Sequence, residues 1–196
     1  MNLQNTFDDI LCDKTLREST VLALSETWLN PGTSLNINGY NCINNCIGPG
    51  KGLTLYYSIR IFRPGPQVIE NRIQMTKLVS DEVDIIAVYR SDQGNLDHII
   101  QHLTNLIEHG KNTVVTGDLN ICYNANRNNI VTKYLENEGF IQYMIEATHI
   151  KGRNIDHFYL RHSDRPVNIA SIYRYSPYYS DHNAICATIE LPEDDL

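Results

Sequence analysis

The sequence lacks the features that mark membrane, secreted and disulfide-rich proteins. No apolar run in its 196 residues approaches the length of a membrane span, and no basic, apolar, small-residue signal peptide opens it. The five cysteines are odd in number and scattered, which predicts reduced, mostly buried thiols rather than a disulfide framework or a zinc site. A nuclear or cytoplasmic protein without a membrane partner is therefore expected.

Basic residues are also scarce, because 16 lysines and arginines stand against 23 aspartates and glutamates and give a net charge of −7. Charge-driven binding to nucleic acid draws most of its free energy from lysine and arginine displacing counterions, so this balance argues against a non-specific nucleic-acid coat. It does not exclude a nuclease, since a site that holds a divalent cation needs carboxylates.

What the sequence does contain is the pattern of one layered α/β domain spanning residues 1–196. Apolar residues make up 42% of the chain, enough for a full core, and neither repeats nor low-complexity segments interrupt it. Short apolar runs predict strands at residues 21–24, 52–58, 84–90, 113–118 and 184–191, while helical spacing predicts helices near residues 7–11, 99–107 and 128–139. Gly110 and Gly139 are expected to end the last two helices, and the Asn- and Gly-rich stretch 41–52 to form a surface loop. Hairpin-sized gaps between several strands favour a mixed sheet.

Polar clusters follow these strands in a fixed order. They are "SETW" at residues 25–28, "YRS" at 89–91, "GDLN" at 117–120, "NIDHFYL" at 154–160 and "YSDHNAI" at 179–185. Each has an ordinary reading as well: Glu26 in a solvated turn, Asp118 and Asn120 in an Asx-turn, Asp156 and Asp181 in surface pairs with the histidines that follow them. Sites of layered α/β proteins are built at strand ends, so the recurrence predicts one shared cleft.

The order and wording of these motifs resemble the endonuclease/exonuclease/phosphatase superfamily, and especially the apurinic-type endonuclease domains of non-LTR retrotransposons and Helitron-related elements. "LALSETWL", "VTGDLN", "NIDHFYL" and "YSDHNAI" carry the resemblance and span almost the whole chain. It implies a four-layered α/β sandwich of two mixed sheets flanked by helices, and hydrolysis of a phosphodiester with Mg²⁺ or Mn²⁺.

The resemblance also implies roles for individual residues. Asp118 would orient or deprotonate the attacking water, Asn120 would donate to the scissile phosphate, and Tyr89 would contact that phosphate. His182 would bind a phosphoryl oxygen, with Asp156 fixing its tautomer and favouring the imidazolium.

Metal and substrate contacts are implied in the same way. Glu26 would be a metal ligand, and Asp181 a ligand or second-site carboxylate. Thr148, eight residues before Asp156, matches a threonine near the cleft, although threonine and Tyr89 alike are more often packing residues. Arg174 opens "RYSPYY", a loop suited to entering a groove or stacking on a base, or simply to packing as a hairpin.

The N-terminus departs from the family pattern. Relatives begin with a core strand that ends in a metal-positioning asparagine, and here only Asn2 matches it, so most of the first core strand is expected to be missing. Three functions stay open: a monomeric DNA-nicking endonuclease, with a fused or associated reverse transcriptase or helicase; a phosphatase on small or lipid-linked phosphates; and a catalytically silent remnant. Lys51, Arg60, Arg63 and Arg90 are candidates for phosphate contacts.

Overall fold

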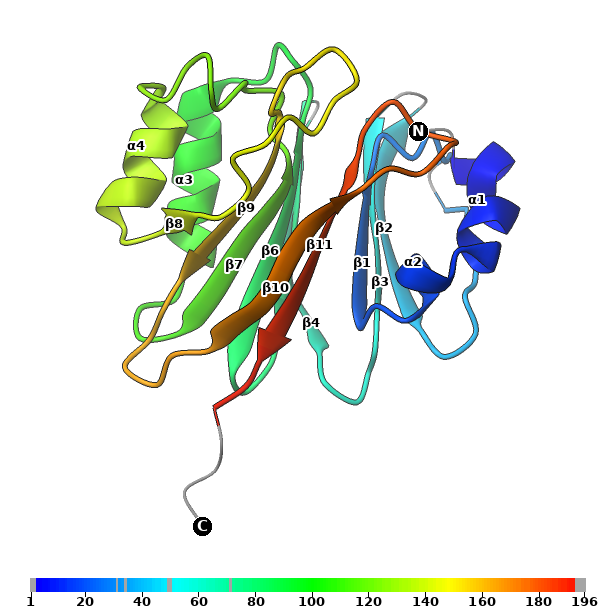
Figure 1. Cartoon of the computed structure of the whole chain (residues 1–196), viewed down its shortest axis with the longest axis horizontal. Helices are drawn as coiled ribbons and strands as arrows, with labels where there is room; N and C mark the ends of the chain where they lie inside the picture. Colours follow the sequence, from blue (N-terminus) through cyan, green and yellow to red (C-terminus); the bar gives the residue numbers. More distant parts are fainter. Residues whose placement is uncertain (1–2, 31, 34, 49–50, 71, 193–196) are drawn as a thin grey trace.

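The computed structural model describes residues 3–30, 32–33, 35–48, 51–70 and 72–192, and arranges them in four layers (Figure 1). Helices α1 (Leu3–Cys12) and α2 (Lys14–Arg17) form one outer layer, and α3 (Leu96–Leu106) and α4 (Ile130–Asn137) form the other. Two layers of strands lie between them: β1 (Val21–Ser25), β2 (Asn41–Gly48), β3 (Lys51–Tyr57), β4 (Arg63–Glu70), β5 (Ile73–Val79), β6 (Val83–Arg90), β7 (Asn112–Asp118), β8 (Ile141–Gln142), β9 (Asp156–Arg161), β10 (Asn168–Tyr175) and β11 (Ala184–Glu190). The predicted layered α/β sandwich is confirmed.

The larger layer is a six-stranded sheet in the order β4-β5-β6-β7-β9-β8. Strands β6 and β7 run parallel because helix α3 connects them, whereas every other pair is antiparallel, so the prediction of a mixed sheet is confirmed. Its outer face packs on α3 and α4 through a buried apolar cluster that includes Ile86, Leu103 and Leu135. Asn95 and Asn129 cap the two helices, each accepting a backbone N–H through its side chain.

The facing layer consists of two separate antiparallel sheets rather than the single mixed sheet that was expected. One has the order β1-β3-β2, and the other is the hairpin β10-β11. In the described part of the chain no strand bridges β1 and β11, and none precedes β1, because residues 3–12 form a helix. The apolar side chains of both sheets that face the six-stranded sheet join one buried cluster with Val114 and Phe158.

The prediction of a surface loop at residues 41–52 was wrong for its described part, because residues 41–48 form β2 and residues 51–52 begin β3. Asparagine is disfavoured in strands, but tertiary contacts supply partners here. The Asn45 amide is buried and donates to the Met75 carbonyl at 3.2 Å and to Thr76 Oγ1 at 2.5 Å, and the Asn44 amide donates to the Thr33 carbonyl at 2.7 Å.

The two glycine predictions have different outcomes. Gly139 ends α4 as expected: it has φ +82°, its N–H donates to the Glu136 carbonyl, and the next N–H, of Phe140, donates to the Leu135 carbonyl. Gly110 is not the cap of α3, which ends at Leu106 with Ile107 as its capping residue.

The structure contains free cysteines and only short helices in its described part. All five cysteines are free, as predicted, but only Cys46 is buried, whereas Cys12 is exposed and the other three are intermediate. Among the helices of the described residues, none combines the length and the apolar character needed to cross a bilayer.

Candidate active site

Strand register brings three of the predicted residues together at one end of the sheets. Tyr89 in β6 lies opposite Asp118, the last residue of the parallel neighbour β7. Asp118 in turn lies opposite Asp156, the first residue of β9. Glu26 follows the last residue of β1 in the facing layer, and it lines the same groove as the two aspartates and His182. The cleft predicted from the strand ends is therefore present.

Glu26 and Tyr89 meet across the two layers. The buried Tyr89 hydroxyl donates to Glu26 Oε1 at 3.2 Å. Burial raises the pKa of Tyr89 above its ordinary value, and the charges of Glu26 and Asp118 raise it further. The phenol is thus held protonated as a donor at the edge of the site.

Asp118 and Asn120 form a tight turn after β7. The Asn120 N–H donates to Asp118 Oδ1 at 2.8 Å, so the Asx-turn reading of "GDLN" is correct, yet the turn lies within the site. Asn120 Nδ2 donates to the Arg90 carbonyl at 2.8 Å and approaches Asp118 Oδ2 at 3.3 Å. A bond from Asn120 to a phosphate would therefore replace the longer of these two contacts.

Gly117 permits this turn to lie against β6. Its φ is +132°, and a Cβ atom built on it would lie 2.0 Å from the Val88 carbonyl oxygen. Only glycine fits so close a backbone approach, which places Asp118 directly beside the end of β6.

Asp156 and His182 form a charge pair. His182 Nδ1 lies 2.9 Å from Asp156 Oδ2, and both side chains are largely buried. Burial alone would lower the pKa of His182, but the hydrogen bond and charge of Asp156, aided by Asp118, raise it to about 9. The side chain is consequently an imidazolium at neutral pH, with Nδ1–H donating to Asp156.

Thr148 fixes the backbone of Asp156 by hydrogen bonds. It is fully buried, and its Oγ1 accepts the N–H of Ile155 at 3.2 Å and of Asp156 at 3.0 Å. The sequence resemblance implied a substrate contact for Thr148, but no exposed atom is present to make one, so its contacts position Asp156 instead.

Asp181 is held by a histidine that the sequence analysis missed. The Asp181 side chain is 59% exposed, and His149 Nε2 lies 3.3 Å from its Oδ2. His149 is buried, and its ring meets that of His182 edge-on at 4.8 Å between centroids. Because His149 Nδ1 accepts the Lys151 N–H at 3.0 Å, its hydrogen lies on Nε2 and is donated to Asp181. The one signal for His149 in the sequence was its position directly after Thr148, which the motifs had already singled out.

Arg174 lies in strand β10 rather than in the predicted loop, and its printed bonds are to residues outside the catalytic cluster. Its Nε is 2.5 Å from Glu146 Oε2, and its Nη1 donates to the Ala147 carbonyl at 2.7 Å. Arg90, a candidate phosphate contact, is buried and donates to the carbonyls of Gly94, Leu119 and Asp92, so that expectation was wrong. Asn2 lies outside the described residues.

A second hollow of about 380 Å³ adjoins the site, and Glu26 lines both. It is lined by Glu26, Tyr89, Asn120, Ser91, Asp92, Lys51 and Arg153. Lys51 and Arg153 bring two cations to an otherwise acidic site, and Arg153 is a further residue that sequence reasoning missed. A phosphate group bound beside Glu26 would lie within reach of both.

The carboxylates of the site suit a hard divalent cation. Burial, and then the charge of Asp156, raise the pKa of Asp118 well above its ordinary value, and Glu26 adds to the effect. One ligand atom each from Asp118, Asp156 and His182 lies within 4.8 Å of the others. The His182 imidazolium is bound to Asp156 and is no ligand, but the carboxylates of Asp118, Asp156 and Glu26 in this groove are the oxygen donors that Mg²⁺ or Mn²⁺ prefers. The group of His149, Asp181 and His182 is equally compact, but the hydrogen on His149 Nε2 makes His149 a donor rather than a ligand.

The layered α/β fold and the acidic cleft at its strand ends agree with the class that the motifs indicated. Residues 3–182 match the model of the Endonuclease/Exonuclease/phosphatase family. The chain belongs to this family, as the motifs indicated. Members of the family are hydrolytic nucleases and phosphatases.

Solved structures agree with this assignment at the level of the fold. The endonuclease domain of TRAS1, a telomere-specific non-LTR retrotransposon, has a TM-score of 0.73 at 13% identity, with 96% of this chain and 93% of that one covered. An AP endonuclease from Archaeoglobus fulgidus has a TM-score of 0.71 at 12% identity, covering 97% and 96%. The 3′ phosphatase NExo from Neisseria, bound to a product DNA hairpin, has a TM-score of 0.67 at 14% identity, covering 96% and 94%. A comparison with curated proteins gives no match.

Proposed function

We propose that the chain is a Mg²⁺- or Mn²⁺-dependent phosphodiester hydrolase that nicks one strand of DNA, as a retrotransposon-type endonuclease does. The observation that carries this proposal is the pairing of an imidazolium, His182 on Asp156, with the buried carboxylate of Asp118 in one cleft. A cation and a base on either side of one phosphorus are what hydrolysis of a phosphodiester requires.

The catalytic residues divide the work as follows. Asp118, whose raised pKa makes its carboxylate a stronger base than an ordinary aspartate, orients and deprotonates the attacking water. His182 donates to a phosphoryl oxygen and stabilises the charge that grows there, while Asp156 holds the imidazolium in place. Asn120 donates to the same phosphate group, and the Tyr89 hydroxyl does so in place of its bond to Glu26.

Glu26 and Asp181, with Asn2, would hold the metal ion, and His149 would orient the Asp181 carboxylate. When bound, Mg²⁺ or Mn²⁺ supplies Lewis-acid stabilisation of the phosphoryl oxygens. A bound divalent cation would reverse the local charge of this acidic site, so a chain of net charge −7 can still act on a polyanion.

DNA is the proposed partner, and its backbone would pass over Lys51 and Arg153 in the hollow beside Glu26. Arg174, at the end of β10 and already paired with Glu146, would contact DNA beside the loop that leads from β10 to Ser180. We further propose that residues 1–196 act as one monomeric domain in the nucleus or cytoplasm, and that a fused or associated reverse transcriptase or helicase uses the nicked product.

The first test is nicking of supercoiled plasmid with Mg²⁺ or Mn²⁺. We expect relaxed circles from the wild type and from His98→Ala, a matched control on a half-exposed histidine of α3, and none from His182→Ala or Asp118→Asn. Circular dichroism confirms that all four proteins fold.

The family and the similarity to a 3′ phosphatase favour a phosphatase as the second candidate. Release of phosphate from inositol phosphates, with no nicking, would replace the endonuclease with that activity. If the folded wild type releases nothing from either substrate with either metal, the chain is catalytically silent.

A further inference from the structure

Two histidines and a glutamate meet on the outer face of the six-stranded sheet, away from the catalytic cluster. His98 Nδ1 lies 3.2 Å from Glu70 Oε2, and His102 Nε2 lies 2.8 Å from Glu70 Oε1. The histidines belong to α3, which packs on the sheet face opposite the one that borders the active-site groove (Figure 1). Two imidazoles therefore share one carboxylate at a place that the proposed hydrolysis does not use.

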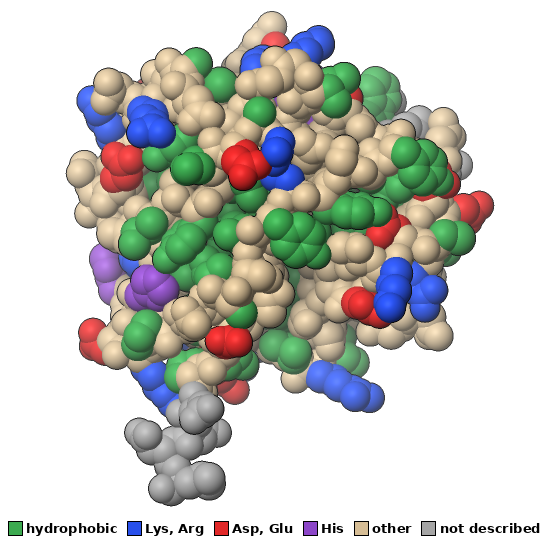
Figure 2. Space-filling model, viewed as in Figure 1, with side chains coloured by type: hydrophobic (Ala, Val, Ile, Leu, Met, Phe, Trp, Pro, Cys, Tyr) green, Lys and Arg blue, Asp and Glu red, His purple; other side chains and the backbone are tan. Residues whose placement is uncertain are grey.

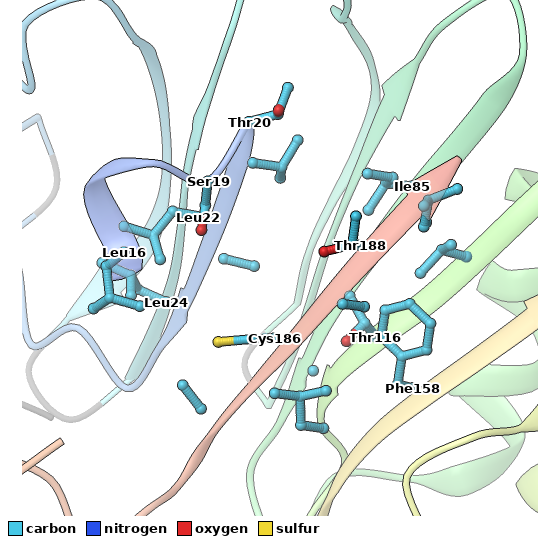
Figure 3. A pocket seen from close by; sticks show the side chains of 18 of the residues that line it. Leu16, Ser19, Thr20, Leu22, Leu24, Ile85, Thr116, Phe158, Cys186 and Thr188 are labelled. Atoms are coloured by element: carbon cyan, nitrogen blue, oxygen red, sulfur yellow. The ribbon is translucent and has the colours of Figure 1, made fainter. Parts of the chain in front are cut away.

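The groove side of the sheet has a different character. Figure 3 shows Leu22 and Leu24 of β1 on one side of the groove, and Ile85 and Phe158 of the six-stranded sheet on the other. Hydrophobic side chains are also exposed across the middle of the face drawn in Figure 2. Hydrocarbon side chains offer a metal ion no lone pairs, so the imidazoles and the carboxylate on the α3 side are the better donors.

Helix α3 holds the two histidines on one face. His98 and His102 are four residues apart, about one helical turn, so their side chains are neighbours on the helix surface. Asn95 caps the first turn, and the buried Ile99 and Leu103 anchor the adjoining face of the helix in the core. The two rings cannot separate without disrupting a capped and buried helix.

Strand β4 brings the carboxylate to these rings. Val68 packs against the core cluster that α3 also joins, and Glu70, two residues farther along the strand, points to the same face of the sheet. The Glu70 carbonyl accepts Nε2 of Gln74 at 2.9 Å, which fixes the backbone at this end of β4. All three donors are thus positioned by regular secondary structure.

The cluster is open enough for an ion to enter from solvent. The side chains of His98 and Glu70 are 51% and 38% exposed, whereas that of His102 is 19% exposed. In the described part of the chain, only groups at the catalytic cluster place three ligand atoms within 4.8 Å of one another. A shared ion therefore requires the ring of His98 to turn toward His102, a rotation that a half-exposed side chain can make.

The donor set differs from that of the catalytic site and selects a different metal. Zn²⁺ binds histidine nitrogen and glutamate oxygen, and three such ligands leave one position for water. Mg²⁺ prefers oxygen donors alone. When each imidazole is neutral and carries its hydrogen on the nitrogen that faces away from Glu70, both lone pairs and the carboxylate can meet one ion.

We propose that His98, His102 and Glu70 bind a Zn²⁺ ion separate from the catalytic metal. The ion would link the edge strand β4 to α3. Pro64 and Pro66 have no N–H to donate, and the β4–β5 ladder changes register between Pro64 and Gln67, so a metal link would add to a strand with an interrupted ladder.

The test is isothermal titration of the whole chain with ZnCl₂ at neutral pH, in the presence of excess Mg²⁺. Loss of a residue that merely supports a metal ligand weakens metal binding about 10–100-fold, so His98→Ala and Glu70→Gln should each weaken Zn²⁺ binding at least about tenfold. The matched control is His109→Ala, on an exposed histidine beyond the end of α3, and we expect a change within about twofold. Circular dichroism confirms that each variant folds.

Imidazole nitrogen chemical shifts locate the ion independently. We expect the resonances of His98 and His102 to move with the first equivalent of Zn²⁺, and the thermal unfolding midpoint to rise in the wild type but not in His98→Ala. Three results would overturn the proposal: no Zn²⁺ binding by the wild type, equal binding by Glu70→Gln, or shifts confined to His149 and His182, which would place the ion at the catalytic cluster only. None of these measurements depends on nuclease activity.

Discussion

Replacing Asp156 by asparagine isolates the electrostatic role of the His182 pair. With Asp156 present, His182 has a pKa of about 9 against an ordinary 6.5, although burial opposes the charged form. Asparagine keeps the shape but removes the charge, so burial should bring the pKa of His182 to 6.5 or below. A fall of at least about 2.5 in pKa corresponds to ~3 kcal/mol of lost stabilisation of the imidazolium.

The assay is the pH titration of imidazole chemical shifts by NMR, in wild type and in Asp156→Asn. Asp181→Asn is the control, because the Asp181 carboxylate is a smaller contributor to the pKa of His182 and does not bond to its ring. We expect only a small change from that variant. If His182 still titrates near 9 in Asp156→Asn, the reasoning is refuted, and Asp118 rather than Asp156 holds the proton on the ring.

The same pair makes stability depend on pH. The folded-state pKa of His182 lies above the unfolded value, so its contribution is complete below about pH 6.5 and is lost as pH rises through about 9. Urea unfolding should therefore show a decline of up to ~3 kcal/mol over this window in the wild type. His182→Asn should lack that decline, and an unchanged slope in the variant would count against the assignment.

Three further predictions concern neighbouring residues. His157 is fully buried and donates from Nε2 to the Ile121 carbonyl at 2.7 Å, and burial lowers its pKa to about 4. Between pH 6.5 and 4 the unfolded state therefore gains a proton that the folded state does not, and the free energy of unfolding should fall by up to ~3 kcal/mol. His157→Gln should remove that part of the acid slope in urea unfolding, and identical slopes would contradict this. Gly117→Ala should cost at least ~3 kcal/mol in urea unfolding, against ~1 kcal/mol for Gly110→Ala, whose φ of +75° is similarly unusual but whose Cβ would meet no atom within 4 Å; equal costs would refute the close-approach argument. Arg153→Gln should raise KM for DNA and reduce the salt dependence of binding by about one phosphate contact, while Lys133→Gln on α4 should change neither; a loss of kcat alone would exclude a simple phosphate contact.

Local patterns in the sequence were sufficient for the parts of the fold and site that depend on local chemistry. The apolar strands β3, β6, β7 and β11 and the Gly139 helix end follow from composition and turn residues. The motif "GDLN" predicted both an Asx-turn and a site, and the structure shows that the turn is what carries Asp118 into the cleft.

Residues that depend on distant partners could not be predicted in this way. Asn44 and Asn45 look like loop residues until Thr33, Met75 and Thr76 provide hydrogen-bond partners from other elements. Arg90 looks like a surface cation, but its environment is set by Gly94 and Leu119, and no local pattern reveals that these carbonyls converge on it.

His149 and Thr148 illustrate the same limit within the site. Thr148 was singled out through the family resemblance as a substrate contact. It is fully buried, however, so it cannot reach a substrate and instead accepts the N–H of Asp156. The bond from His149 to Asp181 depends on two segments that are 32 positions apart along the chain and meet only in the folded protein.

Left-handed backbone conformations occur at three residues other than glycine in the described part of the chain: Glu26 at φ +54°, Trp28 at +56° and Asn120 at +51°. Two of the three carry side chains of the candidate site, where such conformations cost of order 1–3 kcal/mol each. Selection for stability and selection for activity therefore pull these positions in opposite directions. A library screened only for thermal stability would favour glycine at positions 26 and 120, and the selected variants would be more stable but would lack two side chains of the candidate site.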